Sequence, residues 1–577
     1  MEGSRHTGSL APPARHPDST GPSRIVRFLP SFTDVVFIVP LLLLFTRWGG
    51  TLRLLGDGDT GWHLRTGEWI LAHGRVPKVD LYSFTRPEAP WFAREWLWDA
   101  VFGWLHQRFG MEAVVLGCCL VVSVALVLVY RLARRLSGNP LLALLVTLLA
   151  AAASWIHWFA RPHLVTLLFA AIFFHVLERA REGRLRWLWV LPFLTLAWTN
   201  LHAGFFVGIL MLAAYGAGQA VDAARRPGSQ AWRASWRAAT PYGAAAAACL
   251  AASLLNPYGY HLHAHIYRYA GDAYIYQNIG EFRSYDFHHP AAIPVELMFG
   301  LGLLAAAWSV FRRRTAHALL LAGWIHLAFY SLRNIPVYAL LAAPAIAVML
   351  SEGLVLAARF WKDPAWRRLA RGFLARAAEW GRIDRLARVP VASTVFTALL
   401  ATALYSQAAP PFFKAAYDPQ RYPEAALQHL DPAGADQRVF SLDEWGDYLI
   451  YRLYPDIRVF VDGRSDFYGA ELCGQYQHII RLQPGWSELL NRHRIDTVLL
   501  PVDAPLAGAL KLAHQWIPTY DDGRSIIFRR AAAVAPGRPQ QPDSLPDGTA
   551  GGMPAIAHLR ESIDDAKTRG PYGPGEE

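Results

Sequence analysis

The sequence predicts a polytopic α-helical membrane protein that ends in a small α/β domain. Of the 577 residues, 53% are hydrophobic and only 18% are charged, whereas about 25% of residues are charged in an average soluble domain. The shortage is local, because six long windows contain no charged residue: 35–46, 113–130, 140–160, 187–220, 241–267 and 390–413. A helix needs about 20 mostly apolar residues to span a bilayer. After about residue 415 the composition becomes that of a soluble domain.

The net charge of +11 does not indicate a nucleic-acid-binding protein. The basic residues form discrete clusters beside the apolar windows, which is the distribution that positive-inside topology produces. The clusters are Arg131/Arg134/Arg135, Arg179/Arg181/Arg184/Arg186, Arg225/Arg226/Arg233/Arg237, Arg312–Arg314 and 359–388. The four cysteines give no disulfide framework, since three of them lie in predicted spans and Cys473 stands alone.

About eleven spans can be placed in order along the chain. They cover roughly 33–47, 112–130, 139–157, 163–178, 187–200, 203–221, 239–256, 291–311, 316–331, 334–357 and 390–408. If the N-terminus is cytoplasmic and the spans alternate in direction, every basic cluster falls on the inside. We therefore expect a disordered cytoplasmic tail at 1–30, a transmembrane domain at 31–410 and an extracytoplasmic C-terminal region.

The first outside loop, 48–111, contains the stretch Gly56-Asp57-Gly58-Asp59. Two carboxylates one residue apart repel each other, so at least one should bind a cation, take up a proton or meet a basic partner. Asp59 could instead simply cap the helix that follows it. The aromatic run from Trp62 to Trp69 predicts an amphipathic helix on the membrane surface, and 95–109 predicts a second amphipathic stretch.

The other outside turns are short but rich in polar side chains. They contain Arg161, His163, Asn200, His202, Asn256, Tyr258, Glu281, Arg333 and Asn334. Polar groups at membrane depth are expensive and usually face a cavity or one another. Five such turns on one side of the membrane predict the walls of a site. The alternating His261, His263 and His265 invite a metal interpretation, but an interfacial helix is favoured, because the three share one face only in an extended backbone.

Residues 411–530 predict a small α/β domain. Short strands are expected at 438–442, 458–462, 497–501 and 525–529, and helices at 444–454 and 486–493. Asp462, Arg464 and Asp466 follow a predicted strand and could form a binding edge or a salt-bridged turn. The tail at 531–577 is rich in Pro, Gly, Ala and Asp, and we expect it to be disordered.

A first span, an outward loop with a close acidic pair, an aromatic helix, about eleven spans and an outward C-terminal domain together resemble the GT-C glycosyltransferases. The motif likeness lies in Gly56-Asp57-Gly58-Asp59 and the helix after it; Trp445-Gly446-Asp447-Tyr448 and Val461-Asp462-Gly463-Arg464 are similar to the soluble tails of uncharacterised bacterial members. The His-Pro-Pro motif of many O-mannosyltransferase-type relatives is missing, since the corresponding region reads Ala93-Arg94-Glu95-Trp96. This departure leaves the donor headgroup and the acceptor class open.

The resemblance implies an enzyme of a bacterial inner membrane that moves a sugar from a polyprenyl-phosphate-type lipid to an extracytoplasmic glycan, lipid or protein acceptor, with inversion. Either Asp57 or Asp59 would be the base, with a slight preference for Asp57 because it lies nearer the span. Arg333 is the first candidate for holding the leaving phosphate and Arg161 the second, although both could instead reach toward lipid headgroups. The wider substrate-binding set is Glu95, Arg161, His163, Asn200, His202, Asn256, Tyr258 and Arg333.

A divalent cation is a further expectation from the same loop. Asp57, Asp59 and Glu95 would offer oxygen ligands that suit Mg²⁺ or Mn²⁺. Alternatively, Glu95 could merely begin the second amphipathic helix, where the helix dipole favours a carboxylate. Two other functional classes also remain open, namely a transporter or flippase of lipid-linked sugar and a non-catalytic membrane scaffold. A transporter usually shows paired halves with interrupted helices, and no such symmetry is visible here.

Overall fold

The computed structural model describes residues 27–225, 230–387, 389–430 and 437–531. The described residues up to Arg530 form one compact unit. The two predicted disordered tails, apart from residues 27–30 and 531, lie outside the described residues.

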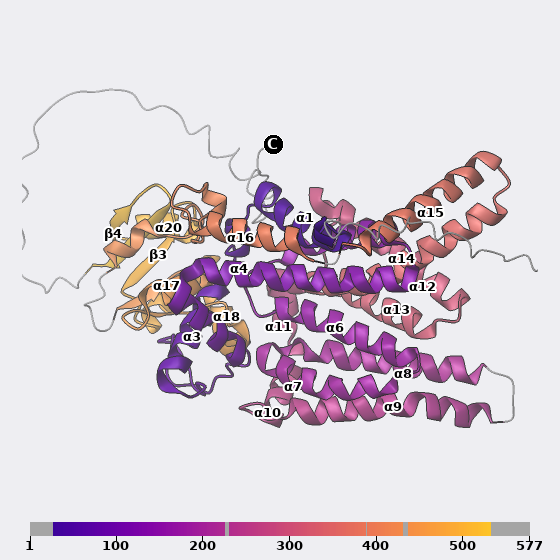
Figure 1. Cartoon of the computed structure of the whole chain (residues 1–577). Coiled ribbons are helices and arrows are strands. Elements are labelled where there is room, and N and C mark those ends of the chain that lie inside the picture. Colours follow the sequence, from indigo (N-terminus) through magenta and orange to yellow (C-terminus); the bar gives the residue numbers. More distant parts are fainter. Residues whose placement is uncertain (1–26, 226–229, 388, 431–436, 532–577) are drawn as a thin grey trace, which may run out of the picture. The chain divides into compact units, whose positions relative to one another are not determined.

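Every window predicted to span the membrane contains a helix (Figure 1). These helices are α1 (Phe32–Arg47), α4 (Trp96–Ser137), α5 (Pro140–Ser154), α6 (Leu164–Arg181), α7 (Leu191–Leu201), α8 (Phe206–Ala224), α9 (Ala231–Ser253), α12 (Ile293–Phe311), α13 (Thr315–Tyr330), α14 (Ile335–Phe360) and α16 (Val391–Tyr405). Among the described residues, 5 helical segments are long and apolar enough to cross a bilayer, and α13 and α16 are shorter apolar helices. The chain is therefore a multi-pass membrane protein, while the number of its crossings stays a prediction.

The first outside loop folds into α2 (Thr51–Leu54) and α3 (Asp59–His73) before α4 begins. The predicted helix after Asp59 is present, but its predicted place on the lipid surface is wrong. Most of α3 is buried, because it packs between α4 and α17 (Asp443–Leu453) of the C-terminal region. The close approach needs glycine, since a Cβ on Gly61 would lie 2.7 Å from the Cβ of Tyr451 in α17.

The expected stretch at 95–109 is the beginning of the long helix α4. The helix bends at Gly110, whose φ of 78° is a left-handed conformation that favours glycine. Between α9 and α12 the chain forms α10 (Tyr260–Ala270), α11 (Ala273–Asn278) and the 3₁₀ turn η5 (Gly280–Phe282). The three alternating histidines lie in α10, so the helical interpretation of that run is confirmed.

A five-stranded sheet forms the core of the C-terminal region. The strands β1 (Arg438–Phe440), β2 (Arg458–Val459), β3 (Thr497–Pro501), β4 (Trp516–Asp521) and β5 (Ser525–Arg530) have the order β2-β1-β3-β5-β4. β1 is parallel to β2 and β3, whereas β5 is antiparallel to β3 and β4. The four predicted strands are all present; β4 and the helices α18 (Ser465–Ile480) and α20 (Pro505–Leu512) were not predicted.

The C-terminal region is tied to the first outside loop by main-chain and buried charged contacts. Val459 of β2 donates to the carbonyl of Tyr82 at 3.0 Å and so extends the pairing into that loop. The Arg464 guanidinium pairs with Asp462 at 2.6 Å and with Asp80 at 2.8 Å, and all three side chains are buried. Asp462 and Arg464 therefore form a buried link between the two parts, and Figure 1 shows α17 beside α3.

Candidate functional site

The acidic pair lies at the N-terminal end of α3. Gly58 is the N-cap of α3, so Asp59 does not cap the helix. The Asp57 side chain accepts a hydrogen bond from the Asp59 amide at 3.0 Å. Asp59 is the first residue of the helix, and its Oδ1 accepts a hydrogen bond from Trp62 Nε1 at 3.2 Å. The two carboxylates thus have different neighbours although only Gly58 separates them.

Arg161, from the turn between α5 and α6, is the basic partner of both carboxylates. Its Nη1 lies 2.5 Å from Asp57 Oδ2, and its Nη2 pairs with Asp59 Oδ2. Of the three outcomes expected for a close acidic pair, the structure therefore shows the basic partner. A guanidinium suits this task because its planar fork can serve two oxygens at once.

Two further charged residues extend this arrangement. Glu281 of η5 lies 3.2 Å from Arg333 Nη1 through its Oε1 and 3.8 Å from Arg161 Nη1 through its Oε2. Asp57, Asp59, Arg161, Glu281 and Arg333 are hereafter called the charged cluster. Their side chains are between 11% and 24% exposed, so the cluster is shielded yet within reach of a ligand.

Burial sets the electrostatics of the cluster. It raises the pKa of Asp59 to about 7, although Arg161 works in the opposite direction. Burial also raises the pKa of Glu281, but the charges of Arg333 and Arg161 outweigh it and hold that pKa below its ordinary value. His163, next to the cluster, has its pKa lowered to about 3 by burial and by Arg161. Its neutral ring donates to the carbonyl of His157 at 2.8 Å.

The C-terminal region contributes Asp447, which lies in the stretch Trp445-Gly446-Asp447-Tyr448 and was not among the predicted site residues. Its Oδ1 accepts a hydrogen bond from the Gly463 amide at 2.9 Å. A Cβ on Gly463 would overlap Asp59 Oδ1 and lie 2.9 Å from Asp447 Oδ2, so both carboxylates converge on this glycine. Burial and the charge of Asp59 raise the pKa of Asp447 well above its ordinary value.

Four predicted site residues form hydrogen bonds with main-chain groups and are not part of the charged cluster. Asn200 donates to the carbonyls of Leu196 and Leu255. His202 Nδ1 accepts from the Gly204 amide at 3.1 Å. The remaining contacts of this kind are Asn256 to the carbonyls of Ser253 and Gly259, and Tyr258 to the carbonyl of Pro77 and the amide of Ala93. Their predicted contacts to a substrate stay predictions.

Glu95 lies in a second group of charges. It is 3.0 Å from Arg94, which is itself 2.6 Å from Asp466 of α18, and His265 lies 2.9 Å from the same Asp466. Within the described ranges there is no group of three His, Cys, Asp or Glu residues that could hold a metal ion. Asp57 and Asp59 pair with Arg161 while Glu95 pairs with Arg94, and the magnesium or manganese site stays a prediction.

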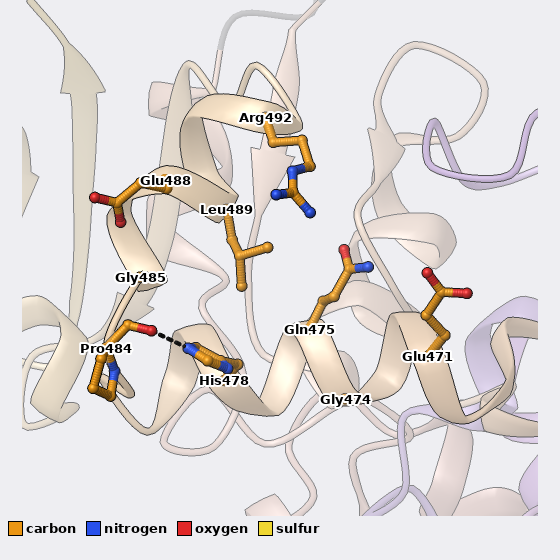
Figure 2. A pocket seen from close by; sticks show the side chains of 9 residues that line it. All are labelled: Glu471, Gly474, Gln475, His478, Pro484, Gly485, Glu488, Leu489 and Arg492. Atoms are coloured by element: carbon orange, nitrogen blue, oxygen red, sulfur yellow. Dashed lines mark hydrogen bonds between the residues drawn. The ribbon is translucent and has the colours of Figure 1, made fainter.

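A surface pocket of about 450 Å³ lies elsewhere, between α18 and α19 (Trp486–Arg492). Figure 2 shows that polar side chains such as Glu471, His478 and Arg492 surround it. None of the predicted site residues lines this pocket, so the candidate site remains the charged cluster.

No model of a known protein family matches this chain, and a search of curated proteins finds no match either. Solved structures do resemble it. The oligosaccharyltransferase AglB from Archaeoglobus fulgidus, in complex with an inhibitory peptide and a dolichol-phosphate, matches with a TM-score of 0.51 and 12% identity over 87% of this chain and 74% of its own.

Two other solved structures match with lower scores. The Archaeoglobus fulgidus oligosaccharyltransferase in complex with Zn and sulfate has a TM-score of 0.46 and 10% identity, over 87% of this chain and 73% of its own. ArnT from Cupriavidus metallidurans, bound to undecaprenyl phosphate, has a TM-score of 0.44 and 15% identity, over 88% of this chain and 98% of its own. At such identities a likeness shows the fold alone. With the match to AglB, the predicted GT-C-like fold is confirmed: this chain is a multi-pass helical membrane protein with that architecture.

Proposed function

We propose that this protein is a membrane glycosyltransferase that moves a sugar from a polyprenyl-phosphate-type donor to an extracytoplasmic acceptor with inversion. The observation that carries the proposal is the charged cluster, in which a carboxylate pair, the carboxylate of Glu281 and two arginines from four separate segments meet within a GT-C-like fold. Transfer from a lipid phosphate needs a base for the acceptor hydroxyl and positive charge for the departing phosphate. The cluster contains both kinds of group.

Asp59 is the base in this proposal. A general base works best when its pKa lies near the working pH, and burial raises the pKa of Asp59 to about 7. Asp57, which the sequence favoured slightly, accepts a hydrogen bond from the Asp59 amide and pairs with Arg161. Asp59 would take the acceptor proton while the acceptor oxygen attacks the anomeric carbon. The bond from that carbon to the phosphate oxygen breaks, and the lipid phosphate leaves with the electron pair.

Arg161 and Arg333 would stabilise the leaving phosphate. Arginine binds phosphate through parallel hydrogen bonds, and Glu281 lies between these two guanidinium groups. A phosphate oxygen that replaces a carboxylate as the partner of Arg161 would release Asp59 Oδ2 for the acceptor hydroxyl. Binding of the lipid phosphate to Arg161 and release of Asp59 to act as the base would then occur in one step.

The proposal places the cluster on the outer side of a bacterial inner membrane, with a cytoplasmic N-terminus. Its support is the distribution of basic residues, which alternates with the predicted spans.

The test is sugar transfer by purified full-length protein in proteoliposomes that contain polyprenyl-phosphate-linked sugars. We expect Asp59→Asn to lower the transfer rate by about 10²–10⁴-fold, the range for loss of a general base, with unchanged expression and insertion. Asp456→Asn is a matched control, because Asp456 is exposed and lies outside the cluster. Normal transfer by Asp59→Asn, or movement of lipid-linked sugar between leaflets without a new glycosidic bond, would contradict the proposal.

A further inference from the structure

The helix α15 (Pro364–Asp384), between α14 and α16, has an exposed apolar stripe. Trp366, Leu369, Trp380 and Ile383 are 56%, 62%, 52% and 45% exposed. With 3.6 residues per turn, these four side chains and that of Phe373 fall within a sector of about 100°. Four large apolar side chains on one face of a surface helix require a partner or a lipid environment.

Arginines occupy the other side of the same helix. Arg368, Arg371 and Arg382 lie within a sector of about 60° opposite the apolar stripe. Arg376 lies within the sector of the stripe, between the directions of Leu369 and Ile383. Arg368, Arg376 and Arg382 are exposed and form no ion pair with any residue that the structure describes. A helix with an apolar face that contains Trp and a basic polar face is typical of a helix that lies in the plane of a bilayer interface.

Small residues and one carboxylate fix α15 against the transmembrane bundle. Ala370, Ala377 and Gly381 are buried, and a Cβ on Gly381 would lie 3.1 Å from Pro140 at the start of α5. The Asp384 carboxylate accepts a hydrogen bond from the Phe32 amide at 2.6 Å and pairs with Arg134 near the end of α4.

These contacts join α15 to helix ends on one side of the bundle. α1 begins at Phe32, α5 begins at Pro140, and α4 and α14 end at Ser137 and Phe360. In Figure 1, α15 lies at the end of the bundle away from the sheet. The basic clusters at 131–135 and 312–314 lie at ends of helices that run to the same side in the predicted topology. This end of the protein is therefore strongly positive where the chain meets the membrane surface.

We propose that α15 is an interfacial helix that inserts its apolar stripe into the leaflet at this end of the bundle and binds anionic phospholipid headgroups through its arginines. Charge complementarity selects this occupant: exposed guanidinium groups attract anionic headgroups, whereas a second copy of the same basic surface would be repelled. The inference concerns lipid recognition and does not depend on the charged cluster or on glycosyl transfer.

Spin labelling of full-length protein in lipid nanodiscs tests the insertion. The four native cysteines are all buried, so Leu369→Cys and Ala378→Cys can each carry one label. Ala378 is the matched control because it is exposed on the opposite side of α15. We expect the label at position 369 to be accessible to oxygen and protected from a water-soluble relaxation agent, and the label at 378 to show the reverse. Equal access to water at both positions, or dipolar broadening between two labels at 369 that reveals a second copy, would overturn the proposal.

Thermal unfolding tests the choice of headgroup. We expect the Tm in nanodiscs of phosphatidylcholine to rise when phosphatidylglycerol is added, and we expect the combined Arg368→Gln, Arg376→Gln and Arg382→Gln variant to lose that rise. A control variant carries the same change of charge at Arg481, Arg492 and Arg524, which are exposed in the C-terminal region, and should keep the rise. A rise that persists in the α15 variant, or one that disappears in the control, would refute anionic lipid binding by this helix.

Discussion

Asp57 and Asp59 are separated by one residue, yet their surroundings give them different chemistry. The Asp57 carboxylate accepts a hydrogen bond from the Asp59 amide through one oxygen and pairs with Arg161 through the other. Asp59 lies deeper, beside Trp62 and the buried Asp447, and its pKa is raised to about 7. A carboxylate that changes protonation near neutral pH can both hold and release a proton during turnover, and this property favours Asp59 as the base.

The pH dependence of transfer should report this difference. If Asp59 is the base, kcat/KM rises as the pH increases through about 7, because the base must be ionised. The charge of Asp57 is one of the causes that raise the pKa of Asp59. Asp57→Asn keeps an oxygen that can accept the hydrogen bond from the Asp59 amide but removes that charge. The acidic limb of the profile should therefore move to lower pH while activity persists. Measured pH–rate profiles decide the point: loss of all transfer in Asp57→Asn alone would make Asp57 the base.

The same shift has a consequence for stability. Asp59 keeps its proton in the folded protein up to about pH 7, whereas the unfolded chain loses it near the ordinary value of 3.8. Between these pH values the folded state binds the extra proton, so the contribution of this group to stability falls as the pH rises through the window. Asp59→Asn should therefore flatten the dependence of Tm on pH between about 4 and 7.

For individual residues, the sequence predicted the chemical type of partner that the acidic pair needs but not which residue provides it. A close acidic pair was expected to bind a cation, take up a proton or pair with a basic side chain, and Arg161 is that basic side chain. Arg333 was the first candidate for the phosphate, and it pairs with the carboxylate of Glu281. Which turn contacts which is a property of helix packing, and spacing along the chain does not contain it. Asp447 was overlooked for the same reason, since it lies nearly 400 residues from Asp59.

Among the elements, α3 shows why an amphipathic pattern is ambiguous in a membrane protein. Trp62 and Trp69 suit a helix at the lipid interface, yet α3 is enclosed by protein. Gly61 and Gly67 in the middle of the helix were the available signal, because glycine there costs about 1 kcal/mol relative to alanine and needs a packing reason. A Cβ on Gly67 would overlap the backbone of Asp99 in α4. The strands of the C-terminal region were easier to predict, since β3 and β5 are short, continuous apolar runs.

In the turn after β2, Gly463 lies against the carboxylates of Asp59 and Asp447. The Gly463 amide holds Asp447, and its missing side chain leaves room for the Asp59 carboxylate. Gly463→Ala should displace that carboxylate and reduce transfer. The overpacking should lower the free energy of unfolding by about 1–3 kcal/mol, and the Tm should fall with it. Its backbone φ lies outside the left-handed region, so the effect would be steric and not due to backbone strain.

Gly474→Ala provides the control for this steric effect. Gly474 lies in α18, and a Cβ there would meet no atom within 4 Å. Alanine at such a helical position should keep transfer and leave stability equal or about 0.5–1 kcal/mol higher. Thermal scans and transfer assays of the two variants compare a methyl group added at a crowded position with one added where there is open space. Equal behaviour of both variants would mean that Gly463 does not determine where Asp59 lies.

For the whole molecule, the organisation that the sequence could predict is the one governed by the bilayer. A helix occurs in each of the eleven apolar windows, because length and apolarity follow from the lipid environment and not from long-range contacts. The docking of the C-terminal region onto the first outside loop was not predictable in this way. It depends on the buried pairing of Arg464 with Asp80, which are 384 positions apart.

The sidedness of the chain gives the last prediction. The distribution of basic clusters places α15 on the inside and the C-terminal sheet on the outside, and Figure 1 shows these two parts at opposite ends of the bundle. Leu512→Cys, at a position that is 85% exposed in α20, should react with a membrane-impermeant maleimide on spheroplasts. Ala378→Cys should react only after the membrane is permeabilised. The unsubstituted protein serves as the background control, because all of its cysteines are buried. The reverse pattern of labelling would place the charged cluster in the cytoplasm, where an extracytoplasmic acceptor could not reach Asp59, and the proposed transfer reaction would have to be abandoned.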